Sequence, residues 1–190
     1  WTQMSYEGSV GIIAFSELDI AALQYIYGNN PEIRAEDDNY IYDESKPTFI
    51  WDGAGLDTID ASTSTDSVTI FLKPGYLGFK GLTQQSELIT SPGQITVNFG
   101  TEIENLIGSN FSDVLTGNEL NNSLIGGKGD DKIDGDSGID IAVYAANFNE
   151  VTLTNFVDYG SSGENIQLKT SWNIIQGNET DTLKNIERLK

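Results

Sequence analysis

The residues of this chain whose type and spacing most clearly indicate chemistry are aspartates that recur among glycines. From residue 125 to residue 140 the sequence reads I-G-G-K-G-D-D-K-I-D-G-D-S-G-I-D, which contains five glycines and five aspartates. Carboxylate oxygens are preferred ligands of calcium, which binds about six to eight oxygens at about 2.3–2.6 Å. The stretch is therefore either an acidic flexible linker or the binding site of a cation.

A nine-residue repeat favours the second interpretation. Residues 108–116, 117–125, 126–134 and 135–143 share glycine at position one. The residues at positions six and eight are Asp113, Asn122, Asp131 and Asp140, and Leu115, Leu124, Ile133 and Ala142, respectively. The pattern matches the calcium-binding nonapeptide G-G-x-G-x-D-x-U-x, in which U is a large apolar residue. A linker has no reason to keep apolar residues in phase, so the repeat indicates calcium sites.

The repeat also predicts how its aspartates are positioned. Glycines allow the first six residues of each repeat to form a tight turn, and the last three form a short strand with an inward apolar residue. Two repeats make one coil, so equivalent turns stack eighteen residues apart, at a strand spacing of about 4.8 Å. Asp131 then lies over Asp113, whereas Asp140 lies over Asn122 and is expected to bind calcium more weakly, with one carboxylate fewer. The other aspartates are expected to face solvent: Asp130, Asp134 and Asp136.

The composition excludes several classes of protein and site. The 190 residues carry a formal net charge of −19, which disfavours nucleic acids and anionic membranes as partners because both repel an acidic surface. The chain has no cysteine and no histidine, so disulfides, thiolate chemistry and histidine catalysis are excluded within it. We expect no membrane span, because no apolar run of about 18 residues is present. The start W-T-Q-M-S-Y does not resemble a signal peptide.

Short strands are expected to position these sites, with one helix before them. Residues 16–28 predict a helix that begins at Ser16 and ends at Gly28. Its apolar residues are expected to face the core: Leu18, Ala21, Ala22, Tyr25 and Ile26. Candidate strands are 39–42, 48–51, 67–72 and 95–99, with a late antiparallel pair at 151–157 and 165–175. No βαβ alternation is present, so the sequence predicts a mostly β fold.

Several segments together resemble the serralysin family, secreted bacterial zinc metalloproteases with a C-terminal calcium-binding RTX β-roll. The resemblance runs from about residue 3 to residue 143 through M-S-Y (4–6), L-D-I-A-A-L-Q-Y-I-Y-G-N-N (18–30), W-D-G-A-G-L-D-T-I-D (51–60) and I-E-N-L-I-G (103–108). It implies a parallel β-roll or β-sandwich with one N-terminal helix and a C-terminal β-hairpin cap. The implied domains are the end of a catalytic domain (1–30), a β-sandwich part (31–107), the β-roll (108–143) and a hairpin capping module (144–190).

The resemblance also implies about four calcium sites, in which residues without a carboxylate act through their backbone carbonyl oxygens. One site combines Arg34, Glu36 and Asp38 with Asp52, Ala54, Gly55 and Asp57. Another combines Glu102 and Glu104 with Gly117, Glu119 and Asn122. The two sites of the repeats combine Ser109, Phe111 and Asp113 with Gly126, Lys128 and Asp131, and Asn118, Leu120 and Asn122 with Gly135, Ser137 and Asp140.

The chain departs from the family pattern at both ends. The zinc motif H-E-x-x-H-x-x-G-x-x-H is absent, although M-S-Y resembles the Met-turn that follows it, with Met4 beneath the zinc and Tyr6 as an auxiliary zinc ligand. Tyr6 cannot hold a catalytic zinc alone, so zinc is expected only in a parent catalytic domain. The chain looks like a piece cut after the motif, and it should be inactive alone. Residues 143–148 and 181–190 resemble a hairpin module of other RTX proteins, adhesins included.

The leading hypothesis is a calcium-induced folding module of a secreted metalloendopeptidase, exported by type I secretion and located outside the cell. Four calcium ions would reduce the net charge from −19 to about −11, which weakens the self-repulsion that opposes folding. We expect a monomer whose partners are calcium ions and the parent catalytic domain.

Two alternatives stay open. The first is a calcium-binding module of an extracellular adhesin or polysaccharide-modifying enzyme, with Trp1, Trp51 and Trp172 available for stacking on sugars. The second is a hydrolase that uses a carboxylate pair such as Asp57 and Glu104. Acids flanked by glycine at nonapeptide spacing suit metal binding better than this acid–base chemistry.

Overall fold

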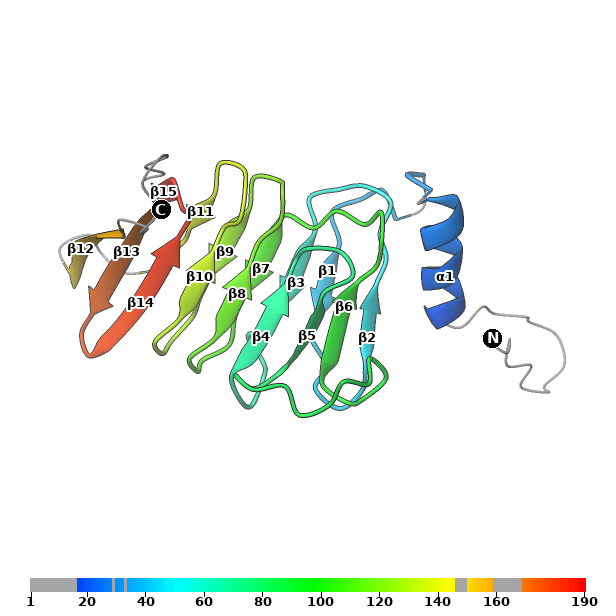
Figure 1. Cartoon of the computed structure of the whole chain (residues 1–190), viewed down its shortest axis with the longest axis horizontal. Coiled ribbons are helices and arrows are strands. Elements are labelled where there is room, and N and C mark those ends of the chain that lie inside the picture. The colour runs from blue at the N-terminus through cyan, green and yellow to red at the C-terminus, as the bar shows by residue number, and fades with distance from the viewer. Residues whose placement is uncertain (1–16, 29, 33, 146–149, 159–168) are drawn as a thin grey trace, which may run out of the picture.

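Two β-sheets run along the length of the described chain, with one helix beside one end (Figure 1). The computed structural model describes residues 17–28, 30–32, 34–145, 150–158 and 169–190. The six-stranded sheet contains, in spatial order, β1 (Asn39–Ile41), β3 (Thr58–Asp60), β7 (Asn105–Ile107), β9 (Ser123–Ile125), β11 (Ile141–Ala142) and β15 (Arg188–Leu189). The nine-stranded sheet contains β12 (Val151–Asp158), β13 (Lys169–Gln176), β14 (Glu179–Lys184), β10 (Lys132–Asp134), β8 (Val114–Thr116), β4 (Val68–Phe71), β5 (Leu77–Lys80), β6 (Gln94–Val97) and β2 (Thr48–Ile50). The predicted mostly β fold is confirmed.

The nonapeptide repeats form the regular central part of this β-roll. The chain passes through β7, β8, β9, β10 and β11 and alternates between the two sheets, so each coil adds one strand to each sheet. Leu115 of β8 pairs with Ile133 of β10, and Leu124 of β9 pairs with Ala142 of β11, both in parallel register. The expected stacking of turns eighteen residues apart is therefore confirmed.

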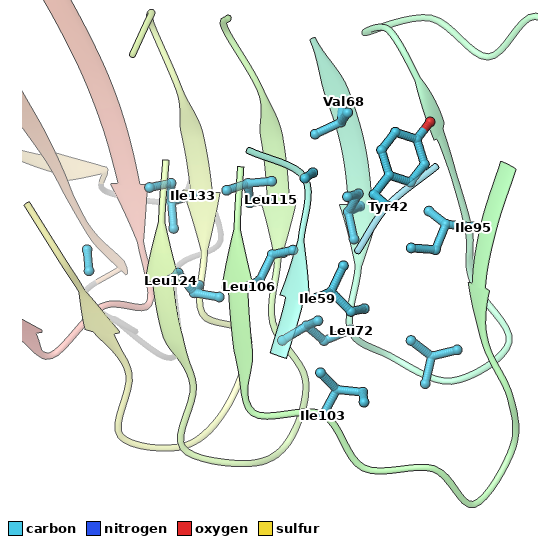
Figure 2. Close-up of a cluster of buried hydrophobic side chains, with 14 of the residues drawn as sticks. Tyr42, Ile59, Val68, Leu72, Ile95, Ile103, Leu106, Leu115, Leu124 and Ile133 are labelled. Atoms are coloured by element: carbon cyan, nitrogen blue, oxygen red, sulfur yellow. The ribbon is translucent and has the colours of Figure 1, made fainter. Parts of the chain in front are cut away.

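The core is a narrow row of apolar side chains between the sheets (Figure 2). In a three-residue strand the middle side chain points to one face and its two neighbours to the other. The inward residues of the coils are at most 1% exposed; they are Ile59, Leu106, Leu124 and Ala142 in the six-stranded sheet, and Ile70, Leu115, Ile133 and Leu183 in the nine-stranded sheet. Truncating one large buried side chain costs about 2–5 kcal/mol. The position-eight residues of the repeats thus hold the sheets together, as the sequence predicts.

The C-terminal segment continues both sheets of the roll. β12, β13 and β14 form an antiparallel meander, which confirms the predicted late antiparallel pair as β12 and β13. β14 then pairs in parallel with β10, and β15 pairs in parallel with β11. The last strands therefore occupy the places that a further coil of repeats would take.

The helix α1 (Glu17–Tyr27) lies beside β2 at the other end of the roll (Figure 1). Gln24 is buried and accepts a hydrogen bond of 3.2 Å from Asn98 Nδ2, and the Tyr25 ring contacts Phe99 edge-on at 5.3 Å between centroids. The predicted buried face is wrong at Tyr25 and Ile26, which are 72% and 66% exposed. The described contacts of the helix with the roll include those of Gln24 and Tyr25, and neither of them buries the Tyr25 ring or the Ile26 side chain. Within the described ranges, no helix has the length and apolar character that crossing a membrane needs.

Candidate calcium sites

Polar side chains form two columns along the roll, one beside each sheet. The six-strand column consists of the residues that immediately precede the strands of the six-stranded sheet: Asp38, Asp57, Glu104, Asn122, Asp140 and Glu187. The nine-strand column consists of Asp113 and Asp131, which immediately precede β8 and β10, and of Asp181 in β14; the register of the three strands places them level with one another. Parallel pairing in register stacks each column residue on the next. Sequence analysis anticipated the stacking of Asp113 with Asp131 and of Asn122 with Asp140.

A repeated hydrogen bond fixes the column residues against their neighbours, except between Glu104 and Asn122. The backbone N–H of one residue donates to a side-chain oxygen of the residue in the next turn. Asp113 N donates to Asp131 Oδ1 at 2.8 Å, Asp131 N to Asp181 Oδ1 at 2.9 Å, Asp38 N to Asp57 Oδ1 at 2.8 Å, Asp57 N to Glu104 Oε2 at 2.9 Å, Asn122 N to Asp140 Oδ1 at 2.8 Å, and Asp140 N to Glu187 Oε2 at 2.7 Å. The carboxylates are therefore held in the gaps between successive turns.

Three of these carboxylates keep a buried oxygen without a hydrogen-bond partner. The atoms are Asp57 Oδ2, Asp131 Oδ2 and Asp140 Oδ2, and the residues that carry them are 0%, 1% and 0% exposed. A buried polar atom without a partner costs about 1–3 kcal/mol, and more when the group is charged. Calcium coordinates such oxygens directly, so the three atoms fit a bound cation.

Electrostatics indicates the same need for positive charge. Burial raises the pKa of Asp131 to about 8, and the charges of Asp181, Asp113 and Glu179 add to this increase. Burial also raises the pKa of Asp57 and of Asp140 to about 6, with further increases from neighbouring acids. The ionised form of each carboxylate is therefore unfavourable in the fold until a cation compensates for it.

Backbone carbonyl oxygens approach the same gaps from both sides, and glycines make room for them. A Cβ built on Gly127 would lie 1.9 Å from the Ser109 carbonyl oxygen below it, and a Cβ on Gly138 would lie 2.3 Å from that of Leu120. In the opposite direction, the Gly126 carbonyl oxygen would lie 2.3 Å from a Cβ on Gly108. Side chains at these glycines would fill the space between turns. The atoms nearest to these three glycine positions are thus carbonyl oxygens of the neighbouring turns.

Side chains alone do not make a metal site here. In the parts of the chain that the structure describes, no group of three or more acidic side chains is arranged to hold a metal. Three expected ligands of the repeats have exposed side chains: Phe111, Lys128 and Ser137. That residues without a carboxylate contribute their backbone carbonyl oxygens stays a prediction. The buried members are Ser109, Asp113, Asn118, Asn122, Gly126, Asp131, Gly135 and Asp140, and Leu120 is half-buried.

The expected site at Arg34–Asp57 is brought together around Gly55. A Cβ built on Gly55 would lie 2.4 Å from the Glu36 carbonyl oxygen and 2.8 Å from Asp57 Oδ1. Asp52 is buried and accepts hydrogen bonds from Tyr40 Oη and from Ala54 N, which tie the turn after β2 to Tyr40 of β1. The remaining expected members, Arg34 and Asp38, lie on the facing segment, where the Arg34 carbonyl oxygen accepts from Ala54 N at 3.3 Å.

The gap between Glu104 and Asn122 differs from the others, because amide groups already satisfy its carbonyl oxygens. Asn118 Nδ2 donates to the Ile103 carbonyl oxygen at 2.7 Å, and Asn122 Nδ2 donates to that of Glu104 at 3.2 Å and to Asn118 Oδ1 at 3.1 Å. The other expected ligands lie at this gap, with Gly117 buried and Glu102 and Glu119 exposed. The two amides place N–H groups where a cation would otherwise meet these oxygens.

Comparisons with known proteins agree with this geometry. Residues 107–142 match the model of the RTX calcium-binding nonapeptide repeat, in four copies. A serralysin of Photorhabdus laumondii is 35% identical over 147 residues, which cover 65% of this chain and 29% of that protein. The chain carries a serralysin-family RTX domain. A serralysin of Photorhabdus luminescens is 36% identical, and the metalloprotease AprA of Pseudomonas entomophila is 35% identical, each over 120 residues that cover 56% of this chain and 23% of the relative. The chain thus spans less than a third of the length of these relatives.

Sequence analysis missed two members of the columns of this RTX domain, Asp181 and Glu187. Asp181 is buried, and its Oδ2 accepts a hydrogen bond of 2.8 Å from Tyr144 Oη. A signal was present, because D-T-L (181–183) and E-R-L (187–189) each place an acid two residues before an apolar residue, as D-V-L (113–115) does. Of the three aspartates expected to face solvent, Asp130 is exposed. Asp134 and Asp136 are partly exposed and form ion pairs with Lys184 and Lys73, respectively.

The remaining candidate residues of the serralysin resemblance and of its alternatives can be placed as follows. Met4 and Tyr6 lie outside the described residues. Trp51 is covered by the guanidinium group of Arg34, which lies 3.9 Å from its ring centroid, so this face is not open for a sugar. Asp57 is 0% exposed, which does not suit a catalytic acid that must reach a substrate.

Proposed function

We propose that this RTX domain is a calcium-induced folding module of a secreted bacterial metalloendopeptidase. The observation that carries the proposal is the set of buried, unpartnered oxygens on Asp57, Asp131 and Asp140, which lie in columns of stacked carboxylates. The ligand sets that we propose are those expected from the sequence, with the acids of both columns as the charged members. The gap between Glu104 and Asn122 is excepted, because the amides of Asn118 and Asn122 stand there in place of a cation. Zinc belongs, in this proposal, to the catalytic domain of the parent protein.

Calcium binding would supply much of the free energy of folding. The calcium-free chain carries a net charge of −19 and buries like charges close together, both of which oppose compaction. A ligand at about 100 times its Kd stabilises the folded state by about 2.7 kcal/mol per independent site. Three or four such sites would contribute about 8–11 kcal/mol, which is comparable to the entire stability of a typical domain, about 5–15 kcal/mol.

The same coupling suits export from the cell. At low cytosolic calcium the chain would stay loosely folded and pass through a type I secretion channel, and it would fold in the calcium of the extracellular medium. The parent would then act as a secreted monomer, with this module supporting the stability of its catalytic domain. The named relatives are serralysins and metalloproteases, and the exposed apolar residues of α1, Tyr25, Ile26 and Tyr27, offer a surface for that domain.

A calcium titration of the purified chain tests the proposal. We expect the far-UV circular dichroism signal to change from a largely disordered form in EGTA to a β form as calcium is added. The triple variant Asp57→Asn, Asp131→Asn, Asp140→Asn should need a much higher calcium concentration. The matched control Glu32→Gln, Glu87→Gln, with two exposed carboxylates outside the columns, should titrate like the parent chain. A complete β spectrum in excess EGTA, or equal titrations of the triple variant and the control, would overturn the proposal.

A further inference from the structure

The turn Asn185–Glu187, between β14 and β15, repeats the geometry of a nonapeptide turn without its sequence. In the repeats, the backbone N–H of the first glycine donates to the residue that precedes the first glycine of the next turn. Gly108 N donates to the Ile125 carbonyl oxygen and Gly117 N to that of Asp134, each at 2.8 Å. Gly135 N donates in the same way to the carbonyl oxygen of Lys184, at 3.0 Å. Asn185 therefore stands where the next first glycine would stand.

The backbone angle of Asn185 differs from that of the first glycines, so the equivalence rests on the hydrogen bond and on the strand register. The φ angle of Asn185 is +50°, in the left-handed region that asparagine tolerates better than most residues, whereas Gly108, Gly117, Gly126 and Gly135 have no positive φ. The register of β15 on β11 then places Glu187 level with Asp140, where a further repeat would have its position-six aspartate. Three residues thus take the place of the six-residue turn of a repeat.

Two oxygens converge over Gly135 beneath this turn. A Cβ built on Gly135 would lie 2.2 Å from the Asn185 carbonyl oxygen and 2.4 Å from Asp140 Oδ2. The equivalent pair occurs over Gly108 in the repeats, at 2.3 Å from the Gly126 carbonyl oxygen and 2.6 Å from Asp113 Oδ2. The gap above Asp140 therefore has the same oxygen arrangement as the gap above Asp113.

Asp140 is the carboxylate that most clearly lacks a partner in this gap. Asp113 Oδ2 accepts a hydrogen bond of 2.5 Å from Ser109 N, whereas Asp140 Oδ2 is buried and unpartnered. Glu187 brings a second carboxylate to the gap, where its Oε2 accepts from Asp140 N at 2.7 Å. The nearby lysines do not compensate for these charges, since among the described residues Lys184 pairs with Asp134 and Lys73 with Asp136.

We propose that the turn Asn185–Glu187 closes a further calcium site over the turn Asp136–Asp140. Its ligands are Asp140 Oδ2, the Glu187 carboxylate and the carbonyl oxygen of Asn185. The carbonyl oxygens of Asp136 and Gly138 complete the set, because they occupy positions two and four of their turn, as Ser109 and Leu120 do where their carbonyls approach the next turn. Five protein oxygens and water satisfy the six to eight that calcium takes, at about 2.3–2.6 Å.

Two ligands of this site, Asn185 and Glu187, lie beyond the matched repeats, which end at residue 142. The site rests on the proposed calcium binding of the domain, and it adds that the C-terminal strands are themselves held by an ion. Calcium would then decide whether β15 stays on β11, because the ion bridges the turn before β15 and the turn before β11.

Calcium counting on the full 190-residue chain tests the site. Native mass spectrometry and isothermal titration calorimetry would compare the parent chain with Glu187→Gln and with the control Glu87→Gln, an exposed carboxylate outside the columns. Glutamine can still accept the Asp140 N–H bond, so the fold should persist. We expect Glu187→Gln to lose one calcium ion, or to bind it at least about tenfold more weakly, while the control keeps the parent count.

Hydrogen exchange gives a second readout on the same proteins. In Glu187→Gln, the backbone N–H groups of Glu187 and Arg188, which donate to the Asp140 carbonyl oxygen at 3.1 Å, should lose their calcium-dependent protection. Protection of β8 should not change. Unchanged calcium count and unchanged protection in Glu187→Gln would refute this site but leave the proposed function standing. Failure of the parent chain to bind any calcium would instead refute the proposed function, and this site with it.

Discussion

Substitution of Asp131 by asparagine should change the stability of the roll in opposite directions with and without calcium. Asp131 is 1% exposed and lies between Asp113 and Asp181 in the nine-strand column. Its Oδ1 accepts the Asp113 N–H, and its Oδ2 has no hydrogen-bond partner. Asparagine keeps the shape and one acceptor oxygen but removes the central carboxyl group of three stacked acids.

The magnitude follows from these contacts. In EGTA the substitution removes a buried, unpartnered carboxylate oxygen, which costs about 1–3 kcal/mol, so the free energy of unfolding should rise by about that amount. With calcium at about 100 times its Kd, the loss of one site should lower the free energy of unfolding by about 2.7 kcal/mol. The loss should be larger if ions bind in both gaps that Asp131 borders.

Urea unfolding followed by circular dichroism measures both effects. The calcium-free protein can be brought into a measurable range with trimethylamine N-oxide, which is excluded from protein surfaces and favours compact states. The midpoint of Asp131→Asn should lie above that of the parent chain in EGTA and below it in calcium, and the exposed control Glu87→Gln should shift little in either condition. A shift of the same sign in both conditions would refute the reasoning that Asp131 is a carboxylate held for a cation.

Three further substitutions test other parts of the argument. Gly127→Ala places a Cβ 1.9 Å from the Ser109 carbonyl oxygen, so it should lower the free energy of unfolding by about 2–4 kcal/mol and weaken calcium binding. Its control Gly177→Ala, at φ +63° with nothing within 4 Å, should cost only about 1–2 kcal/mol. Equal losses of the two variants in thermal unfolding would show that the contact with the Ser109 carbonyl oxygen adds no cost. Leu124→Ala should cost about 2–5 kcal/mol in calcium and also in EGTA with trimethylamine N-oxide, whereas Ile139→Ala, at 48% exposure, should cost under about 0.5 kcal/mol. A loss seen in calcium but not in EGTA with the co-solvent would argue against a purely apolar role. Asn122→Asp removes the amide that donates to the Glu104 carbonyl oxygen, so calorimetry should show one additional calcium ion and unfolding in EGTA should show lower stability; an unchanged ion count would mean that the amides do not stand in for a cation.

The sequence predicts the central coils well because the repeat encodes both their period and their inward residues. Leu115, Leu124 and Ile133 are phased with Asp113, Asn122 and Asp131, so strand register and site register follow from the same pattern. β3 and β7 were not predicted, whereas the equally short β1 and β2 were, because N-Y-I-Y and T-F-I-W contain the aromatic residues that favour strands and T-I-D and N-L-I do not.

The C-terminal half of the columns could not be predicted in the same way. Asp181 and Glu187 are separated from their partners by 50 and 47 residues, and no fixed spacing connects them across the β12–β13 hairpin. The predicted burial of one face of α1 was also wrong at Tyr25 and Ile26. An amphipathic pattern indicates that a helix face is apolar, but not whether the surface that covers it lies within the same chain. Local patterns therefore gave the unit of the roll, whereas its ends depend on contacts distant in sequence.

The paired amides of Asn118 and Asn122 divide the six-strand column into two stretches of carboxylates. One stretch, from Asp38 to Glu104, and the other, from Asp140 to Glu187, would each tighten or loosen with the calcium concentration. The joint between them is made of neutral hydrogen bonds, whose strength does not depend on the ion. The middle of the six-strand column is therefore held without calcium, whereas both ends depend on it. As the calcium concentration falls, we expect the ends to open first, while the hydrogen bonds of Asn118 and Asn122 keep the two neighbouring coils in register for refolding.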